Sequence, residues 1–162
     1  MMRLPLSLPA NERGAAIIEL ALAAPFFAAL AIGMIDMSRA YSMKLKLEQC
    51  AQRAIEKSQA SATQPTDFTF LGTEATTAAT AAGYTGSTAT VDYWLECNGV
   101  KTSETTGGPL ATNTCSSGQT YARYVTVTVS NTYTPFFASR IWPNANAQGN
   151  IAVSGYAGMR VQ

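Results

Sequence analysis

One apolar run constrains this chain more than any other feature, because its length matches the thickness of a membrane. It extends from Gly14 to Met37 and reads GAAIIELALAAPFFAALAIGMIDM. A transmembrane helix needs about 20 predominantly apolar residues, and a lone segment in lipid can satisfy its backbone hydrogen bonds only as a helix. We therefore expect a transmembrane helix over residues 15–37. Pro25 lies inside it and is expected to kink the helix or loosen one turn.

Glu19 places a carboxylate near the start of this apolar run. A charged side chain costs about 2.5–3.5 kcal/mol at the bilayer centre and less near its edge. A residue that is so unfavourable in lipid generally has a partner or a function. Glu19 is therefore the candidate functional residue of the run.

The run continues into an amphipathic segment over residues 38–60. Apolar side chains recur there at spacings of three and four, which is the period of one helix face. They are Met43, Leu47, Cys50, Ala51, Ala54 and Ile55. No glycine or proline interrupts the segment between Met34 and Ala62. The pattern predicts one long rod, half in lipid and half packed on a small domain.

The remaining residues, 61–162, are expected to form an extracytoplasmic α+β domain. The expected strands cover residues 88–96, 120–133 and 150–161, and a short helix covers residues 74–82 and ends at Gly83. Alternating Val and Thr residues make the second strand the clearest of the three. Residues 98–119 are expected to be a long polar loop. The predicted fold class is α+β, with a long N-terminal helix packed on one face of a small antiparallel sheet.

Composition excludes several classes of function. The chain has no histidine, which removes the commonest general base and metal ligand. Its net charge of +1 makes no case for nucleic acid. The acidic residues are scattered and no phosphate-binding glycine pattern occurs, so we expect no enzyme activity, no metal and no cofactor.

Three cysteines occur, and none has the spacing of a zinc site. Cys97 and Cys115 flank a polar loop, and a disulfide between them is expected if this region is extracytoplasmic. The alternative is two unrelated thiols. Cys50 lies on the apolar face of the amphipathic segment, where it is expected to be a small buried residue or, alternatively, an intermolecular contact.

The start of the apolar run has a recognisable arrangement. A short leader ends at Gly14, the run begins at Ala15, and Glu19 is its fifth residue. This arrangement resembles the processing site of type IV prepilins. The segment RGAAIIELAL over residues 13–22, followed by Pro25, is most similar to the TadE-like family, the pseudopilins of the tight-adherence (Tad/Flp) pilus machinery. The likeness extends through Gly33, Asp36, Arg39, Ala40 and Tyr41.

The resemblance implies that residues 1–14 are a leader, removed after Gly14 by a membrane prepilin peptidase. Cleavage leaves a new amine on Ala15. Glu19 would then meet a positive charge, which is either its own amine one helical turn away or that of a neighbouring subunit. The implied function is that of a pseudopilin or minor pilin in assembly of a type IVb-like pilus. Its partners would be the peptidase, other pilin or pseudopilin subunits and the bilayer.

Two alternatives remain open at this stage. One is an uncleaved membrane anchor in which Glu19 reaches the interface. The other is a secreted or anchored extracytoplasmic binding protein with an ordinary signal peptide, cut after a small residue such as Ala31. Glu19 inside the apolar core and the amphipathic continuation argue against the second.

The expected location is the inner (cytoplasmic) membrane, crossed once, with the N-terminus in the cytoplasm and the C-terminal domain periplasmic or extracellular. The distribution of basic residues does not favour this orientation, because more of them follow the run than precede it. The leader-like start and the cysteine pair are the grounds for it.

Overall fold

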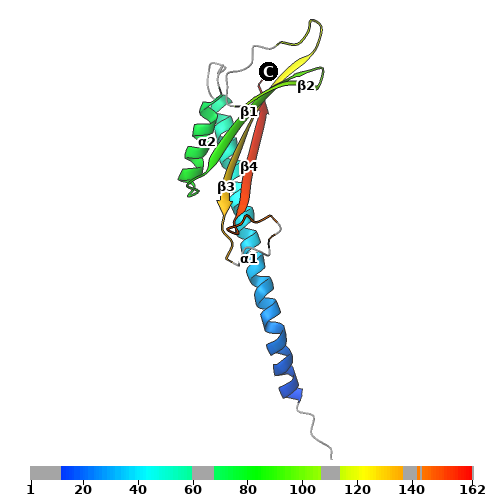
Figure 1. The fold of residues 1–162 in the computed structure, drawn as a ribbon, viewed down its shortest axis with the longest axis vertical. Helices are drawn as coiled ribbons and strands as arrows, with labels where there is room; N and C mark the ends of the chain where they lie inside the picture. Colours follow the sequence, from blue (N-terminus) through cyan, green and yellow to red (C-terminus); the bar gives the residue numbers. More distant parts are fainter. Residues whose placement is uncertain (1–11, 60–67, 107–113, 137–141, 143, 162) are drawn as a thin grey trace, which may run out of the picture.

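A computed structural model describes residues 12–59, 68–106, 114–136, 142 and 144–161. It contains one long helix, one short helix and a four-stranded antiparallel sheet (Figure 1). The elements are α1 (Glu12–Gln59), α2 (Phe70–Ala81), β1 (Thr88–Cys97), β2 (Val100–Thr106), β3 (Tyr121–Tyr133) and β4 (Ile151–Arg160). The predicted α+β fold, with a long N-terminal helix on a small antiparallel sheet, is confirmed.

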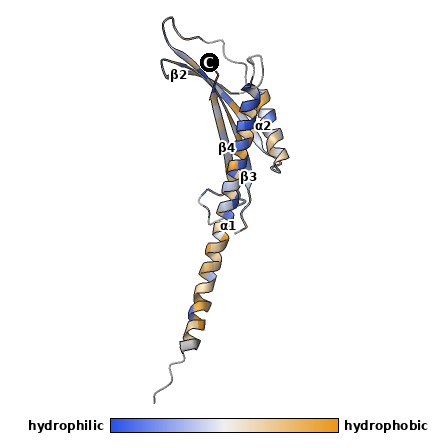
Figure 2. Cartoon of the chain, turned by 180° about the vertical axis from the view of Figure 1, so that it is seen from behind, coloured by the Kyte–Doolittle hydropathy of each residue, from blue (hydrophilic) through white to orange (hydrophobic). Residues whose placement is uncertain are grey.

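Helix α1 has two halves with opposite surroundings. We call residues 14–35 the free half, because none of them is buried, and residues 36–59 the packed half. The free half extends away from the domain and is the most apolar part of the chain, as Figures 1 and 2 show. The helix continues through Pro25 without a break. The single rod expected from the sequence is therefore present.

The sheet has the order β2-β1-β3-β4, with every neighbouring pair antiparallel. Its two helices cover the same face, because α1 packs on β3 and β4 while α2 packs on β1 and β3. The alternation predicted for β3 is borne out on this face, where the side chains of Val125, Val127 and Val129 are fully buried. The helices and the sheet thus enclose one core.

Strand β2 corrects the sequence analysis, which expected residues 98–119 to be loop and the sheet to have three strands. β2 forms a hairpin with β1, in which Cys97 pairs with Val100. The two turn residues between them, Asn98 and Gly99, both have positive φ, at 52° and 79°. Asn-Gly is the preferred sequence of a type I′ hairpin turn. The Asn98-Gly99 dipeptide was the sequence signal for this hairpin. The strand after it was missed because its residues are mostly polar.

Helix α2 begins earlier than the expected residue 74. Its first turn starts at Phe70, and the side chains of Phe68 and Leu71 are fully buried there. Burial of these two side chains in the core extends the helix beyond what its local sequence indicated. The helix ends as predicted before Gly83, whose φ is +92°. The amide of Tyr84 donates to the carbonyl of Ala79 at 2.9 Å, which completes a Schellman cap.

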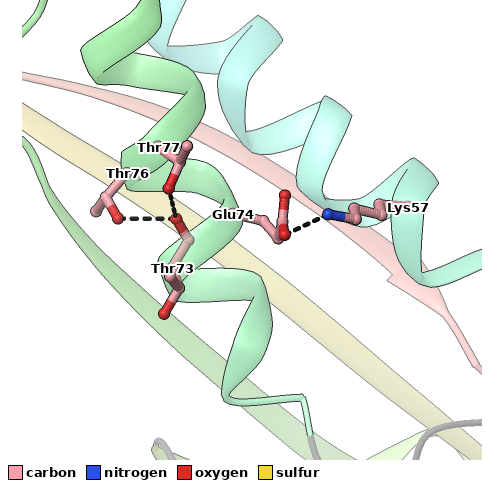
Figure 3. Close-up of polar contacts among 5 residues, drawn as sticks. All are labelled: Lys57, Thr73, Glu74, Thr76 and Thr77. Carbon is pink, nitrogen blue, oxygen red and sulfur yellow. Dashed lines mark hydrogen bonds and ion pairs between the residues drawn. The ribbon is translucent and has the colours of Figure 1, made fainter.

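Polar contacts connect α2 to α1 and provide hydrogen-bond acceptors for threonine hydroxyl groups of α2. Figure 3 shows the ion pair between Lys57 of α1 and Glu74 of α2. The hydroxyl groups of Thr76 and Thr77 donate to the carbonyl of Thr73 at 3.0 and 2.7 Å. Threonine hydroxyls that bond backward in this way find an acceptor within their own helix.

Gly155 permits the closest approach between β4 and α1. A Cβ atom at this position would lie 2.1 Å from the backbone nitrogen of Glu48 and 2.3 Å from the carbonyl carbon of Leu47. Both atoms belong to the backbone of α1, so they cannot move aside as a flexible side chain would. The strand and the helix can therefore pack at this distance only with glycine at residue 155.

We expect Gly155→Ala to destabilise the protein by about 1–3 kcal/mol, because the added methyl group separates β4 from α1. Thermal unfolding of the detergent-solubilised full chain, followed by circular dichroism, measures the loss. Gly72→Ala is the matched control. Its Cβ would make an ordinary contact of 3.6 Å with Val91, and alanine is a better helix former by about 1 kcal/mol. Equal stability of the wild type and Gly155→Ala would contradict the packing argument.

Candidate processing site and membrane-boundary site

The residues of the expected processing site lie in the first turns of α1. Gly14 is half-buried, while Ala15 and Glu19 are exposed. Residues four apart on a helix share a face and are separated by about 6 Å along the axis. Ala15 and Glu19 are related in this way. Within the part of the chain that the structure describes, Glu19 makes no salt bridge.

The rest of the free half exposes large apolar side chains to the surroundings. Ile17 is 68% exposed and Phe26 is 74% exposed. Others of the same kind are Ile18, Leu20, Leu22, Phe27, Leu30, Met34 and Ile35. Among the described residues, the helix over Gly14–Lys57 is long and apolar enough to cross a membrane, and none of its most apolar window is buried inside the protein. This helix is consistent with a single-pass membrane anchor.

Asp36 is a buried carboxylate at the point where the free half meets the domain. It is only 1% exposed. The hydroxyl group of Tyr133 donates to its Oδ1 atom at 2.8 Å, and the backbone amide of Phe136 donates to the same atom at 3.0 Å. These bonds tie α1 to the end of β3 and to the segment that follows it. They also compensate for the cost of burying the carboxylate.

The environment of Tyr133 keeps its hydroxyl group protonated. Burial, followed by the hydrogen bond to Asp36, raises the pKa of Tyr133 above its usual value of 10.0. Between the usual and the raised pKa, the Tyr133 hydroxyl group therefore stays protonated in the folded state, whereas it is ionised in the unfolded chain. The stability contributed by the bond is present below the usual pKa and is lost as pH rises through the raised one.

Arg39 lies one turn beyond Asp36 and is exposed. Its guanidinium carbon lies 4.7 Å from the centre of the Phe136 ring, within the range of a cation–π contact. An open pocket of about 380 Å³ adjoins it. Residues that line the pocket include Arg39, Met43, Tyr84, Thr132 and Thr134. The described parts of the connection between β3 and β4 lie beside α1 at this level (Figure 1).

From the sequence, Asp36 and Arg39 are recognised only as part of a family likeness, with no role assigned to either. The available signal was the carboxylate between Ile35 and Met37, at the end of the apolar run. Its partners, Tyr133 and Phe136, follow about a hundred residues later, and only the fold brings them together.

The cysteines occupy two different environments. Cys97 at the end of β1 and Cys115 form a disulfide, with their Cα atoms 5.6 Å apart. The disulfide closes the connection that contains β2. In the chain-entropy model, a disulfide that closes a loop of this size stabilises the folded state by about 3 kcal/mol. Cys50 is free and buried in the core between α1 and the sheet. It therefore packs as a small apolar residue.

Aromatic side chains divide between the core and the surface. Tyr93 and Tyr133 are buried in the core. Trp94 and Tyr124 stack on the face of the sheet that the helices leave open, with ring centres 5.2 Å apart. No group of three or more His, Cys, Asp or Glu residues that would suit a metal ion occurs among the described residues.

We expect Asp36→Ala to lower the free energy of unfolding by about 2–4 kcal/mol, because it leaves the donors on Tyr133 and Phe136 without their acceptor. Chemical denaturation of the full chain in mild detergent measures the change. Glu48→Ala is the control, since Glu48 forms a partly exposed pair with Lys44 at 3.7 Å and should contribute less than about 0.5 kcal/mol. A loss no larger than that of the control would rule out a structural role for Asp36.

Comparison with known proteins gives one match. Residues 14–55 match the family model described as TadE-like protein. The searches of curated proteins and of solved structures found no match. The family match covers α1 from Gly14 almost to its end and includes Glu19, Asp36 and Arg39. It confirms the resemblance to the TadE-like family over residues 14–55, which we call the TadE-like segment.

Proposed function

We propose that this chain is a non-catalytic pseudopilin or minor pilin in assembly of a tight-adherence pilus. A prepilin peptidase cleaves it after Gly14, and the mature protein begins at Ala15. The mature chain crosses the inner membrane once, with its N-terminus at the cytoplasmic side and its domain outside. Its partners are the peptidase and other pilin or pseudopilin subunits.

The observation that carries this proposal is the free half of α1. It presents a continuous apolar surface that the domain leaves uncovered, and that surface needs lipid or other apolar helices around it. The TadE-like match begins at residue 14, where the proposed cleavage site lies. The Cys97–Cys115 disulfide supports an extracytoplasmic domain, because disulfides persist in oxidising compartments.

Glu19 has a specific role in this proposal. Cleavage removes Arg13 and creates a positive amine on Ala15, on the same helix face as Glu19. An ion pair offsets part of the cost of a carboxylate in lipid. The same carboxylate can instead pair with the amine of a neighbouring subunit, which would make the interaction one of assembly. In either arrangement Glu19 acts only after the leader has been removed.

Gly14→Leu should block processing, because a bulky side chain at the cleavage position would obstruct the peptidase. Expression in the native host, followed by mass spectrometry of the N-terminus, is the measurement. We expect the wild type to begin at Ala15 and the variant to retain residues 1–14. Gly33→Leu is the control, since a Cβ atom at Gly33 would meet no described atom within 4 Å and this variant should be processed normally. A wild-type chain beginning at Met1 or Met2 would contradict the proposal, and one beginning near Ile32 would indicate a secreted protein.

Glu19→Gln should leave cleavage intact and weaken assembly, because glutamine keeps the size of the side chain but not its charge. Co-purification with the other pilus subunits after crosslinking in the native host measures the effect. We expect recovery to fall by about tenfold, which corresponds to roughly 1.4 kcal/mol. Glu56→Gln is the control on the exposed face of the packed half. Unchanged recovery for Glu19→Gln would show that the charge has no role in assembly.

A further inference from the structure

The junction between the two halves of α1 carries an exposed surface that is both basic and aromatic. Phe136 is 72% exposed although its side chain is large and apolar. The guanidinium group of Arg39 lies against its ring. The open pocket beside them is lined in part by the hydroxyl-bearing residues Tyr84, Thr132 and Thr134. We call Arg39, Phe136 and this pocket the boundary surface.

Helix geometry places the boundary surface at the level of the lipid head groups. An α-helix rises about 1.5 Å per residue, and the hydrocarbon core of a bilayer is about 30 Å thick. If Ala15 marks one edge of the core, Ile35 marks the other, and Arg39 lies about 6 Å beyond it. The head-group layer on each side is about 5–7 Å deep. Phe136 contacts Arg39 and therefore lies at the same depth.

The apolar surface of the free half leads directly into the boundary surface. Ile35 is exposed at the end of the free half, and it lies four residues before Arg39, on the same face of α1. The lipid that surrounds the free half must therefore also reach Phe136. Aromatic residues concentrate at this depth in membrane proteins because their rings suit the interface. This continuity favours lipid over another protein as the occupant.

We propose that the boundary surface binds the phosphate of an anionic phospholipid through Arg39, while Phe136 inserts between head groups and acyl chains. Guanidinium groups bind phosphate oxygens in paired, charge-assisted hydrogen bonds. Asp36 positions this site, because its bond to the amide of Phe136 holds that residue beside α1. The inference rests on the membrane anchor in the proposed function and adds the lipid class that the domain recognises.

Depth-dependent fluorescence quenching in vesicles tests the proposal on the full chain. The only two tryptophans, Trp94 and Trp142, are changed to Phe, and Phe136→Trp supplies the reporter. Vesicles contain phosphatidylcholine and phosphatidylglycerol. In each preparation one of the two lipids carries bromine on the acyl carbons nearest its head group. We expect brominated phosphatidylglycerol to quench at least about twofold more strongly than brominated phosphatidylcholine at equal mole fraction. Adding Arg39→Gln should remove this preference.

Lys44→Gln is the matched control, since Lys44 is the next basic residue on α1 and pairs with Glu48. It should leave the preference unchanged. A second measurement does not depend on the tryptophan substitutions. In native mass spectrometry, wild-type protein released from mixed-lipid nanodiscs should retain phosphatidylglycerol over phosphatidylcholine, and Arg39→Gln should retain the two equally.

Three outcomes of the quenching experiment would overturn the proposal. Equal quenching by the two lipids would show that no head group is selected. Loss of quenching as the protein-to-lipid ratio rises would show that a second subunit occupies the surface. Loss of the preference in millimolar inorganic phosphate would show that free phosphate is the ligand.

Flotation with the vesicles separates this inference from the proposed function. A chain that floats without selecting lipid overturns only the inference, whereas a chain that does not float overturns both.

Discussion

The packing of α1 against β3 and β4 is the contact on which the rest of the structure depends. It supplies most of the domain's core, since residues of the packed half meet the buried valines of β3. Gly155 sets the distance of this contact by letting β4 approach the backbone of α1. Without the packing of α1, the small four-stranded sheet would leave the part of its apolar face on β3 and β4 open to water. The same helix then continues as the free half, so one continuous rod joins the domain to the candidate membrane span.

Asp36 marks the place where the surroundings of this rod change. A carboxylate at the end of an apolar run is costly in lipid and costly in a protein core. The bonds from Tyr133 and Phe136 offset that cost and attach the end of β3 to the helix. They also hold Phe136 and Arg39 together at one level of α1. In our proposal, the bonds that stabilise the domain thereby also form the boundary surface.

Two carboxylates of the TadE-like segment have complementary roles in this arrangement. Glu19 lies in the free half, where it has no described salt-bridge partner, and we propose that its partner arises by cleavage or comes from another subunit. Asp36 lies at the junction of the free and packed halves, where the domain supplies its hydrogen-bond donors. One carboxylate therefore serves assembly in our proposal, and the other serves folding.

The sequence by itself determined the long helix, its apolar and amphipathic halves, and the strands β1, β3 and β4. It did so because side-chain periodicity and the length of an apolar run are local properties. It also indicated the family through Gly14 and Glu19. The hairpin strand β2 was missed, although its Asn98-Gly99 turn was a local signal. The early start of α2 depends on burial of Phe68 and Leu71, which is a tertiary effect.

Only the tertiary structure decided which face of the sheet is covered and which residues meet at the boundary. The partners of Asp36 follow it by about a hundred residues in the chain, so no local pattern could have identified them. The need for glycine at residue 155 arises from the backbone of α1, an element far away in sequence. Contacts of this kind depend on how the elements pack, and packing follows from the whole chain at once.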